Sequence, residues 1–362
     1  MFGCCIGGDI QMKNYVYVGC RTTKERNARG KGISVYEANG NVWTQKQILT
    51  GEVNPSYLCM NGRNDRLYAV HGDFSEVSAY AVEADGSLRK LNTMKTHGTN
   101  PVHLTLTKNE KWLIAANLQT GGVSVLPVET DGSLGAIKEL YFISGNGGPG
   151  YISHPHQTML DRSGRWLFVP SQGRLQGVGK VTIFEVDQEN GTLREHFIMK
   201  ARTGAEPRHI VLHPNNCFAY LVNEKDSTVT AYAFDAEKGE LQPLQILTSL
   251  PEDFFGDGWA SAIDIGKDGR FLYLSNRKHD SVTVYAIDQE SGKLQYLQNI
   301  KTRGEQPRFI AVSPEGDRLL AANELTDTIT IFDIDAESGR LIDTGCQIPT
   351  ESPVCAVFGT AE

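Results

Sequence analysis

The chain has 362 residues, of which 40% are hydrophobic and 22% are charged, a composition typical of a globular protein with a sizeable core. The formal net charge of −8 argues against a nucleic acid or an anionic membrane as the main partner. No run approaches the ~18 apolar residues of a membrane-spanning helix. The seven cysteines form no CxxC pattern, so we expect neither a disulfide framework nor a zinc site, and a reducing cytoplasm is favoured.

The first residues, 1–13 (MFGCCIGGDIQMK), lack the basic region and the long apolar stretch of a signal peptide, and we interpret them as a flexible leader. Three predicted strands follow: NYVYVG (14–19), KGISVYE (31–37) and VWTQKQIL (42–49). They match the second, third and fourth strands of a unit that the rest of the chain repeats.

Each repeat contains an alternating strand, a turn, a strand rich in aromatic residues or leucine, a β-branched strand, an acidic glycine turn and a weaker fourth strand. The repeats begin at anchor residues, which are Pro55, Pro101, Pro155, Pro207, Trp259, Pro307 and Pro353. Consecutive anchors are 46 to 54 residues apart. Four short strands in a period of about 50 residues are typical of a β-propeller.

The two ends of the chain complete one another. After Pro353 only one strand remains, VCAVF (354–358), while the N-terminus begins in the middle of a repeat. One C-terminal strand and three N-terminal strands make a seventh blade, which leaves no free sheet edge. We therefore predict an all-β, seven-bladed propeller that forms a single domain over residues 14–362. The rival fold, an open β-sandwich array, would leave both half-blades unpaired.

This fold brings two sets of residues to one mouth of the central channel, because the start of strand one lies beside the end of strand two in an antiparallel meander. The first set follows the anchors and comprises Ser56, Val102, His156, Arg208, Ala260, Arg308 and Val354. The second set follows strand two and comprises Arg21, Gly72, Leu118, Gln172, Glu224, Arg277 and Glu324.

The polar members of these sets, with His154, indicate an anion-receiving pocket that holds an acid and a base. Arginine is the usual clamp for carboxylate or phosphate, and a carboxylate near two arginines is ionised. The plainer interpretations are a solvated Arg277 or an Arg277–Asp280 pair, and a structural salt bridge between Arg208 and Glu224. Of the histidines in SHPHQ (153–157), we choose His156 first for proton transfer. No third ligand lies near this pair in sequence, so we expect no metal site.

Several motifs carry a family resemblance: YVGCRT (17–22), SHPHQ (153–157), EPRH (206–209), NEKDSTV (223–229), DGRFLYLSNR (268–277) and QPRF (306–309). Over residues 14–358 the chain resembles the lactonase family of seven-bladed propellers, which includes 6-phosphogluconolactonase and the fungal carboxy-cis,cis-muconate cyclase. The chain departs from the family pattern at Ser171-Gln172-Gly173, where Asp-Leu-Gly is usual, at Ala262 and at Cys20. These departures lie near the pocket, so they concern the substrate more than the fold.

The resemblance implies hydrolysis of a sugar-acid lactone of the 6-phosphogluconolactone type, with His156, His154, Glu224, Arg208 and Arg277 as the catalytic residues. We expect Arg308, Glu324, Gln172 and Arg21 to bind the substrate, a small anionic lactone. Acyl transfer to water requires no cofactor. The alternatives are a muconate-type cycloisomerase, which would form or open a lactone by proton transfer at carbon, and a non-catalytic interaction propeller.

Overall fold

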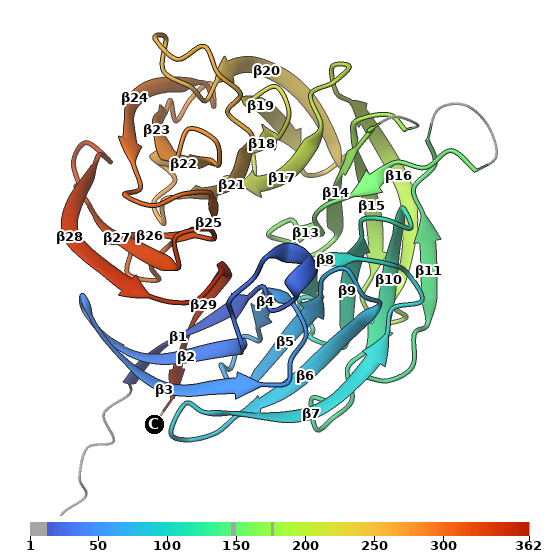
Figure 1. The fold of residues 1–362 in the computed structure, drawn as a ribbon. Coiled ribbons are helices and arrows are strands. Elements are labelled where there is room, and N and C mark those ends of the chain that lie inside the picture. The colour runs from blue at the N-terminus through green and yellow to red at the C-terminus, as the bar shows by residue number, and fades with distance from the viewer. Residues whose placement is uncertain (1–12, 146–149, 175–176, 362) are drawn as a thin grey trace, which may run out of the picture.

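Seven antiparallel sheets stand in a ring as the blades of a β-propeller (Figure 1). This computed structural model describes residues 13–145, 150–174 and 177–361. The predicted seven-bladed, all-β fold is confirmed. Besides strands, the described residues form one short 3-10 helix, η1 (Lys24–Arg26). The expected leader lies outside the described residues, except for Lys13.

Each blade is a meander that runs from an inner to an outer strand. Blade 1 comprises β4 (Pro55–Met60), β5 (Arg66–His71), β6 (Glu76–Val82) and β7 (Leu88–Lys95). Blade 2 comprises β8 (Pro101–Leu106), β9 (Trp112–Asn117), β10 (Gly122–Pro127) and β11 (Glu139–Phe142). Blade 3 comprises β12 (His154–Pro155) with β13 (Met159–Leu160), β14 (Trp166–Gln172), β15 (Lys180–Asp187) and β16 (Thr192–Lys200). Blades 4 to 7 comprise β17 (Pro207–Leu212), β18 (Phe218–Asn223), β19 (Thr228–Asp235) and β20 (Glu240–Thr248); β21 (Ala260–Ile265), β22 (Phe271–Asn276), β23 (Ser281–Ile287) and β24 (Leu294–Lys301); β25 (Pro307–Val312), β26 (Arg318–Asn323), β27 (Thr328–Ile334) and β28 (Leu341–Pro349); and β29 (Pro353–Ala361), β1 (Lys13–Cys20), β2 (Gly32–Asn39) and β3 (Val42–Thr50).

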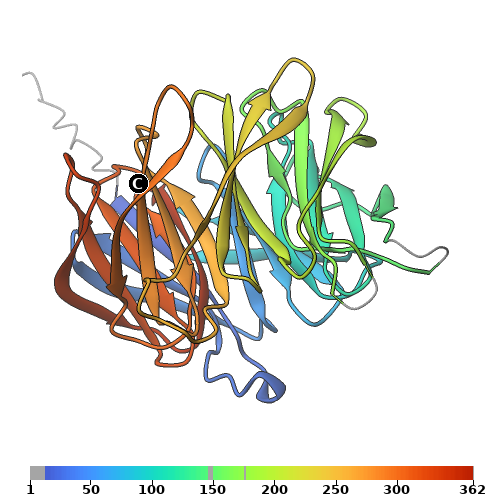
Figure 2. The same ribbon diagram turned by 90° about the horizontal axis from the view of Figure 1, so that it is seen from above.

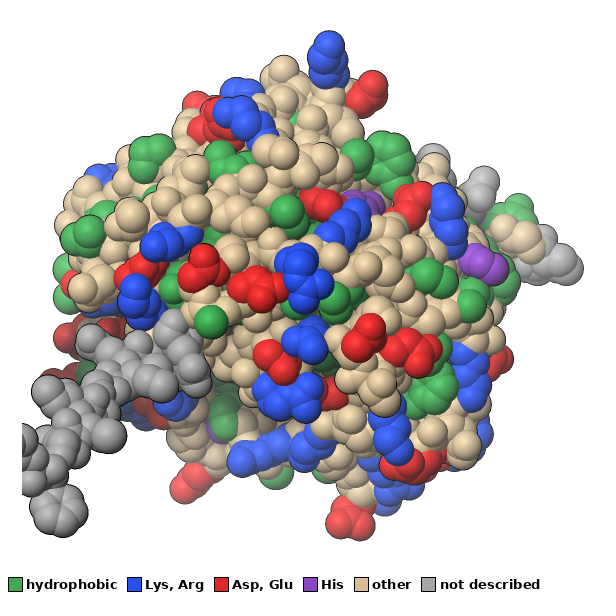
Figure 3. Space-filling view, turned by 90° about the horizontal axis from the view of Figure 1, so that it is seen from below, with side chains coloured by type: hydrophobic (Ala, Val, Ile, Leu, Met, Phe, Trp, Pro, Cys, Tyr) green, Lys and Arg blue, Asp and Glu red, His purple; other side chains and the backbone are tan. Residues whose placement is uncertain are grey.

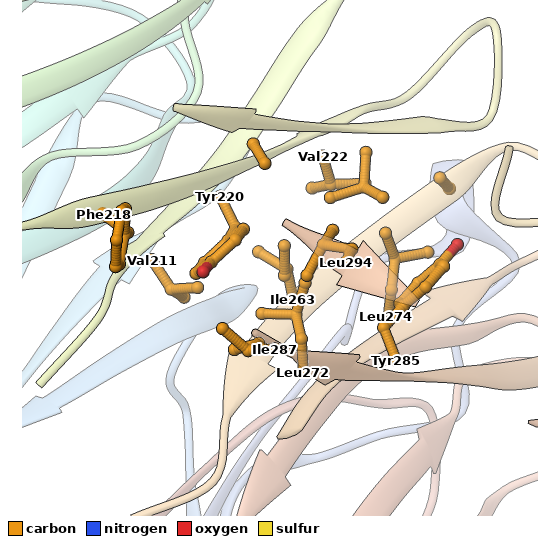
Figure 4. Packing of buried hydrophobic residues seen from close by; sticks show 13 residues of the cluster. Val211, Phe218, Tyr220, Val222, Ile263, Leu272, Leu274, Tyr285, Ile287 and Leu294 are labelled. Atoms are coloured by element: carbon orange, nitrogen blue, oxygen red, sulfur yellow. The ribbon is translucent and has the colours of Figure 1, made fainter. Parts of the chain in front are cut away.

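The core lies between the blades. Second strands such as β18 (FAYLVN) and β22 (FLYLSN) are wholly buried, because each blade packs against a neighbour on both faces. The outer strands are more exposed, as in β24 (LQYLQNIK). Figure 4 shows the cluster between blades 4 and 5, where the packed side chains include Tyr220, Leu272 and Tyr285. On the side of the molecule seen in Figure 3, charged side chains of both signs are interspersed.

Blade 7 is built from both ends of the chain, as predicted. Its inner strand β29 pairs with β1 in a register that runs from Lys13↔Ala361 to Cys20↔Pro353, and the two strands lie side by side in Figure 1. The segment after β1, which contains η1, projects from one face of the ring (Figure 2). This face carries the residues that follow each second strand, and therefore the predicted site.

The seams between blades follow a common pattern on the opposite face. At five of the seven seams an aromatic residue on a second strand covers a glycine in the next blade's outer turn. For example, a Cβ at Gly292 would lie 2.3 Å from the Phe218 ring. Two residues further along the strand, a tyrosine hydroxyl donates to that glycine's carbonyl, as from Tyr220 to Gly292 at 3.0 Å. The tyrosine contact recurs at three other seams, made by Tyr17, Tyr68 and Tyr273.

The seam between blades 6 and 7 lacks both partners. Arg318 and Leu320 hold the positions of the aromatic residue and the tyrosine, and a Cβ at Gly40 would still be 3.7 Å from Arg318 Nη2. A cleft of about 540 Å³ opens here, and Leu320, Trp43 and Phe358 contribute to its lining. The cleft therefore results from smaller and more flexible side chains at one seam.

Leu320→Tyr is expected to stabilise the fold. The ring would enter the existing cleft and bury additional apolar surface, which should raise the free energy of unfolding by about 1 kcal/mol in urea denaturation. Leu319→Tyr is the matched control, because Leu319 is fully buried in the cluster on the other face of β26. There the larger ring should destabilise by roughly 1–3 kcal/mol. Equal destabilisation by both changes would contradict this account of the cleft.

Candidate active site

The central channel narrows to a small cavity at the predicted mouth. Six of the seven expected first-set residues line it: Ser56, Val102, His156, Arg208, Arg308 and Val354. Arg21, Tyr57, His209 and Phe309 complete the lining. The cavity has a volume of about 20 Å³, enough for roughly one water molecule. The meander geometry thus brings residues from all blades but the fifth around one space.

In blade 5 the predicted position was wrong by one residue. Ala260 pairs with Asn276 as Pro207 pairs with Asn223, so Ser261, and not Ala260, corresponds to Arg208. Without a proline to mark the strand start, the sequence pattern placed the anchor at Trp259, which precedes β21 in a left-handed conformation with φ 49°. Ser261 accepts a hydrogen bond from Arg208 Nη1 at 2.7 Å through its carbonyl oxygen, and its hydroxyl donates to the Arg308 carbonyl at 2.7 Å.

Glu224 is the centre of the charged cluster. Its carboxylate lies 2.8 Å from Arg277 Nη2 and 3.3 Å from Arg208 Nε, and it accepts a hydrogen bond of 2.8 Å from Gln172 Nε2. Arg277 therefore neither stands free in solvent nor pairs with Asp280. Gln172, Glu224 and Arg277, which lie at the ends of second strands, thus join blades 3, 4 and 5.

Electrostatics keep Glu224 ionised. Burial raises the pKa of this carboxyl, but attraction from Arg277 and then Arg208 outweighs burial and holds the pKa well below its ordinary value. Burial, followed by repulsion from Arg277 and Arg308, lowers the pKa of Arg208, although a guanidinium remains charged at neutral pH. The single carboxylate between Arg208 and Arg277 thus leaves a net positive charge.

Three buried nitrogens at this point have no hydrogen-bond partner among the described residues: Arg208 Nε, Arg277 Nη2 and His156 Nδ1. The two arginine nitrogens approach Glu224 closely, but not at hydrogen-bonding angles. Each of the three side chains is at most 7% exposed. Buried polar atoms are normally satisfied by protein, water or ligand, so these three nitrogens remain available to an acceptor from outside the protein.

His156 lies in the cavity wall and packs against His209, with ring centroids 5.2 Å apart. Burial and then the charge of Arg208 hold the pKa of His156 well below its ordinary value. The imidazole is therefore neutral near pH 7, the form that accepts a proton.

His154 occupies a different place. Its Nδ1 is 2.8 Å from the carbonyl oxygen of Leu118, the imidazole is partly exposed, and the residue does not line the cavity. This contact fixes the start of the inner strand of blade 3 against blade 2.

A second layer of rings below the cavity mouth was not identified from the sequence. Tyr57 stacks on His103 with centroids 4.0 Å apart, and His209 lies 5.7 Å from His103. Burial raises the pKa of Tyr57 and lowers the pKa of His103 to about 3. Their positions in the sequence could have identified these rings, because Tyr57, His103 and His209 each stand two residues after an anchor residue.

The remaining predicted residues form a second group beside the first. Arg308 Nε lies 4.0 Å from Glu324 Oε2, which accepts a hydrogen bond of 2.7 Å from Gln306 Nε2. Arg21 is 3% exposed and reaches Asp73, with 3.3 Å between Nη1 and Oδ2. Of the nine predicted site residues, the structure thus gathers eight at the mouth and places His154 at its edge.

Two further observations concern the part of the chain that the structure describes. No group of three or more His, Cys, Asp or Glu side chains there is arranged to hold a metal ion. No helix within it is long and apolar enough to cross a membrane. What the mouth does provide is positive charge, a fixed carboxylate and a neutral imidazole around a small space, which suits binding of an anion and proton transfer beside it.

Comparison with known proteins identifies the family. The family model described as "Lactonase, 7-bladed beta-propeller" matches residues 15–358. An uncharacterized protein from Lactococcus lactis subsp. cremoris is 31% identical over 300 residues, 83% of this chain and 72% of that protein. A 6-phosphogluconolactonase from Bacillus subtilis is 34% identical over 138 residues, 38% of this chain and 39% of that protein. The solved structure of a periplasmic gluconolactonase from Pseudomonas aeruginosa has a TM-score of 0.86 and 27% identity, with coverage of 97% of this chain and 100% of that one. The chain belongs to the lactonase family of seven-bladed β-propellers.

Proposed function

We propose that this protein hydrolyses the lactone of a phosphorylated sugar acid, in the manner of a 6-phosphogluconolactonase. The observation that carries the proposal is the set of three buried nitrogens near Glu224, on Arg208, Arg277 and His156, that form no hydrogen bond among the described residues. Two are cationic donors suited to an oxygen that becomes negative, and the third belongs to an imidazole suited to accept a proton. Similarity to proteins named 6-phosphogluconolactonase and gluconolactonase supports the choice of a sugar lactone.

In the proposed mechanism Arg208 and Arg277 bind the lactone carbonyl oxygen and stabilise the charge that develops there. His156 takes a proton from water as the oxygen of that water bonds to the carbonyl carbon. The ring carbon–oxygen bond then breaks, and His156 returns the proton to the departing alkoxide. The product is the open hydroxy acid. Glu224 holds the two arginines in place, because its carboxylate forms ion pairs with both of them.

The substrate class can be tested with a pH-stat panel. The panel contains 6-phospho-δ-gluconolactone, δ-gluconolactone, a γ-lactone and carboxymuconolactone, each corrected for spontaneous hydrolysis. We expect fastest turnover of the phosphorylated δ-lactone. Preference for carboxymuconolactone would replace the hydrolase proposal with the cycloisomerase, and absence of turnover of all four would favour a non-catalytic propeller.

His156→Asn is expected to lower kcat by at least about a hundredfold, the usual contribution of a general base. Asparagine keeps a polar side chain of similar size but does not titrate. The neutral imidazole is the active form, so wild-type activity should be present above the pKa of His156 and fall as the pH drops through it. Because that pKa is lowered, the fall should lie below the ordinary histidine range.

The pH dependence of kcat checks this assignment. The acid limb should be absent from the His156→Asn profile, whereas His154→Asn should retain the limb and most of the activity, because His154 lies outside the cavity. A larger loss from His154→Asn would move the proton transfer to that residue.

We also propose that the protein works in the cytoplasm. The described cysteines, Cys20, Cys59, Cys217, Cys346 and Cys355, form no disulfide, which is usual for a reducing compartment. The similar gluconolactonase from Pseudomonas aeruginosa is described as periplasmic, so fractionation of the native host is the appropriate test. Recovery in a periplasmic or secreted fraction would refute this location.

A further inference from the structure

The Arg208–Glu224–Arg277 group occurs a second time, two blades further round the ring. Arg208 and Arg308 are each the second residue of an inner strand, and Glu224 and Glu324 each follow the second strand of the same blade. Arg277 and Arg21 follow the second strand of the next blade. The sequence motifs EPR and QPR, and Asn-Glu at 223–224 and 323–324, mark the repeat.

The backbone confirms that the positions are equivalent. The amide of Glu224 donates to the Glu206 carbonyl at 2.8 Å, and the amide of Glu324 donates to the Gln306 carbonyl at 3.1 Å. Both carboxylates also accept a hydrogen bond from a glutamine, but from different positions. Gln172, at 2.8 Å, ends the second strand of the preceding blade, whereas Gln306, at 2.7 Å, precedes the inner strand of the same blade. The two groups are therefore built on one template.

They differ in chemistry at two points. In the blade before the first group, blade 3, the residue that follows the anchor Pro155 is His156. In the blade before the second group, blade 5, the equivalent residue is Ser261, so the second group has no imidazole at that position. In addition, the second carboxylate is not held tightly by arginine. Arg308 lies 4.0 Å from Glu324, and Arg21 pairs with Asp73 instead. The second group has the cations of the first without its proton acceptor.

Of the four arginines in the two groups, Arg308 is the most exposed. Its side chain is 21% exposed, compared with 4% for Arg208 and 6% for Arg277. Among the described residues, Glu324 is its only ion-pair partner. Arg308 and Arg21 both line the cavity, whose lining contains no carboxylate, and repulsion from Arg308 contributes, after burial, to lowering the pKa of Arg21 to about 10.

Arg21 reaches this position because its neighbour in blade 1 is small. A Cβ at Gly72 would lie 2.6 Å from Arg21 Nη1. Arg26, from the segment containing η1, pairs with Asp73 as well and adds a third cation beside Arg308 and Arg21. The two groups, with Arg26 and Asp73, together contain five arginines and three carboxylates, on a chain whose net charge is −8. Such a local excess attracts anions.

We propose that Arg308 and Arg21 form a separate oxyanion subsite that holds the phosphate of the substrate while the Glu224 group acts on its lactone ring. The inference rests on the proposed lactonase function and assigns different tasks to the two groups. Blades 1 and 2 present Ser56, Gly72, Val102 and Leu118 at the equivalent positions. The phosphate is therefore bound on the side of blades 6 and 7.

The test is the ratio of kcat/KM for 6-phospho-δ-gluconolactone to kcat/KM for δ-gluconolactone. Arg308→Gln should lower this ratio at least about tenfold, through a higher KM for the phosphorylated substrate, because a charge-assisted contact is lost. Arg308→Lys should recover part of it. Glu324→Gln should act in the opposite direction and lower that KM, because it removes the carboxylate nearest Arg308.

Two variants serve as comparisons. Arg277→Ala should reduce kcat for both lactones by similar factors, so that the ratio changes little. Arg303→Gln, in the segment that leads into the strand of Arg308 but paired with Asp343 outside the cavity, should leave both rates and the ratio at wild-type values. An unchanged ratio in Arg308→Gln, or a loss confined to kcat, would overturn the division of tasks.

Binding of inorganic phosphate, measured by isothermal titration calorimetry, separates the subsite from the reaction. Wild-type protein should bind phosphate, and Arg308→Gln should bind it at least about tenfold more weakly. If the wild type hydrolyses neither lactone, the proposed function fails, yet this phosphate result would still support the subsite. Equal phosphate affinity in wild type and Arg308→Gln would refute the subsite even if lactone hydrolysis is found.

Discussion

Arg277→Ala is expected to lower kcat/KM for the lactone substrate by a hundredfold or more. Arg277 Nη2 is buried without a hydrogen-bond partner among the described residues and lies 2.8 Å from the Glu224 carboxylate. Loss of one cationic donor to a developing oxyanion costs on the order of 2–4 kcal/mol in the transition state. Most of the loss should appear in kcat, because the contact strengthens as charge develops on the oxygen.

The next residue provides the control. Lys278 is exposed, pairs with Asp257 at 3.0 Å and lies over the Trp259 ring. Lys278→Ala removes a positive charge from the same turn. If catalysis depends on the position of Arg277 and not only on the local charge, the Lys278→Ala protein should keep nearly wild-type activity. Thermal unfolding of both variants should stay close to wild type. Wild-type turnover by folded Arg277→Ala protein would exclude Arg277 from the reaction.

Deletion of residues 353–362 is expected to abolish the cooperative fold. The deletion removes β29, which pairs with β1 along its whole length and supplies Val354, Cys355 and Ala356 to the core. Two hydrophobic clusters between blades would lose residues. The edge of β1 would lose its pairing partner, and β4, the inner strand of blade 1, would lose the strand that lies against it. Near-ultraviolet circular dichroism and thermal melting should show no native transition.

A circular permutant tests whether loss of the β29–β1 pairing, and not a change at the end of the chain, abolishes the cooperative fold. Lys13 and Ala361 are register partners, so a short linker can join them while new ends are opened in the exposed turn at 236–238. This chain keeps the β29–β1 pairing and should melt cooperatively. Cooperative melting of the truncated protein within a few degrees of wild type would instead show that β29 is dispensable.

The fold was predictable because its information is local and repeated. Each blade carries its own strand pattern, and a closed ring of such units has few alternatives once the period and the two half-blades are known. The same logic predicted which positions meet at the channel mouth. Arg208, Glu224, Arg277 and Arg308 could therefore be named before their contacts were known, since their places follow from strand ends alone.

Register was the first feature that needed the tertiary structure. In blade 5 no proline marks the start of β21, and only its pairing with β22 shows that Ser261 lies between Arg208 and Arg308. His103 and His209 were also passed over, because a lone histidine in a strand carries no signal until the neighbouring blades bring the rings together.

The state of each charged group was likewise decided by the fold. Sequence placed Arg277 and Arg21 at equivalent positions, but only three-dimensional packing shows that one holds Glu224 while the other turns past Gly72 to Asp73. Burial and the charges of neighbouring blades then set the pKa values of Glu224 and His156. Residue identity and spacing thus determined which groups meet, whereas the distances and the dielectric surroundings that decide their chemistry exist only once seven blades have closed around the channel.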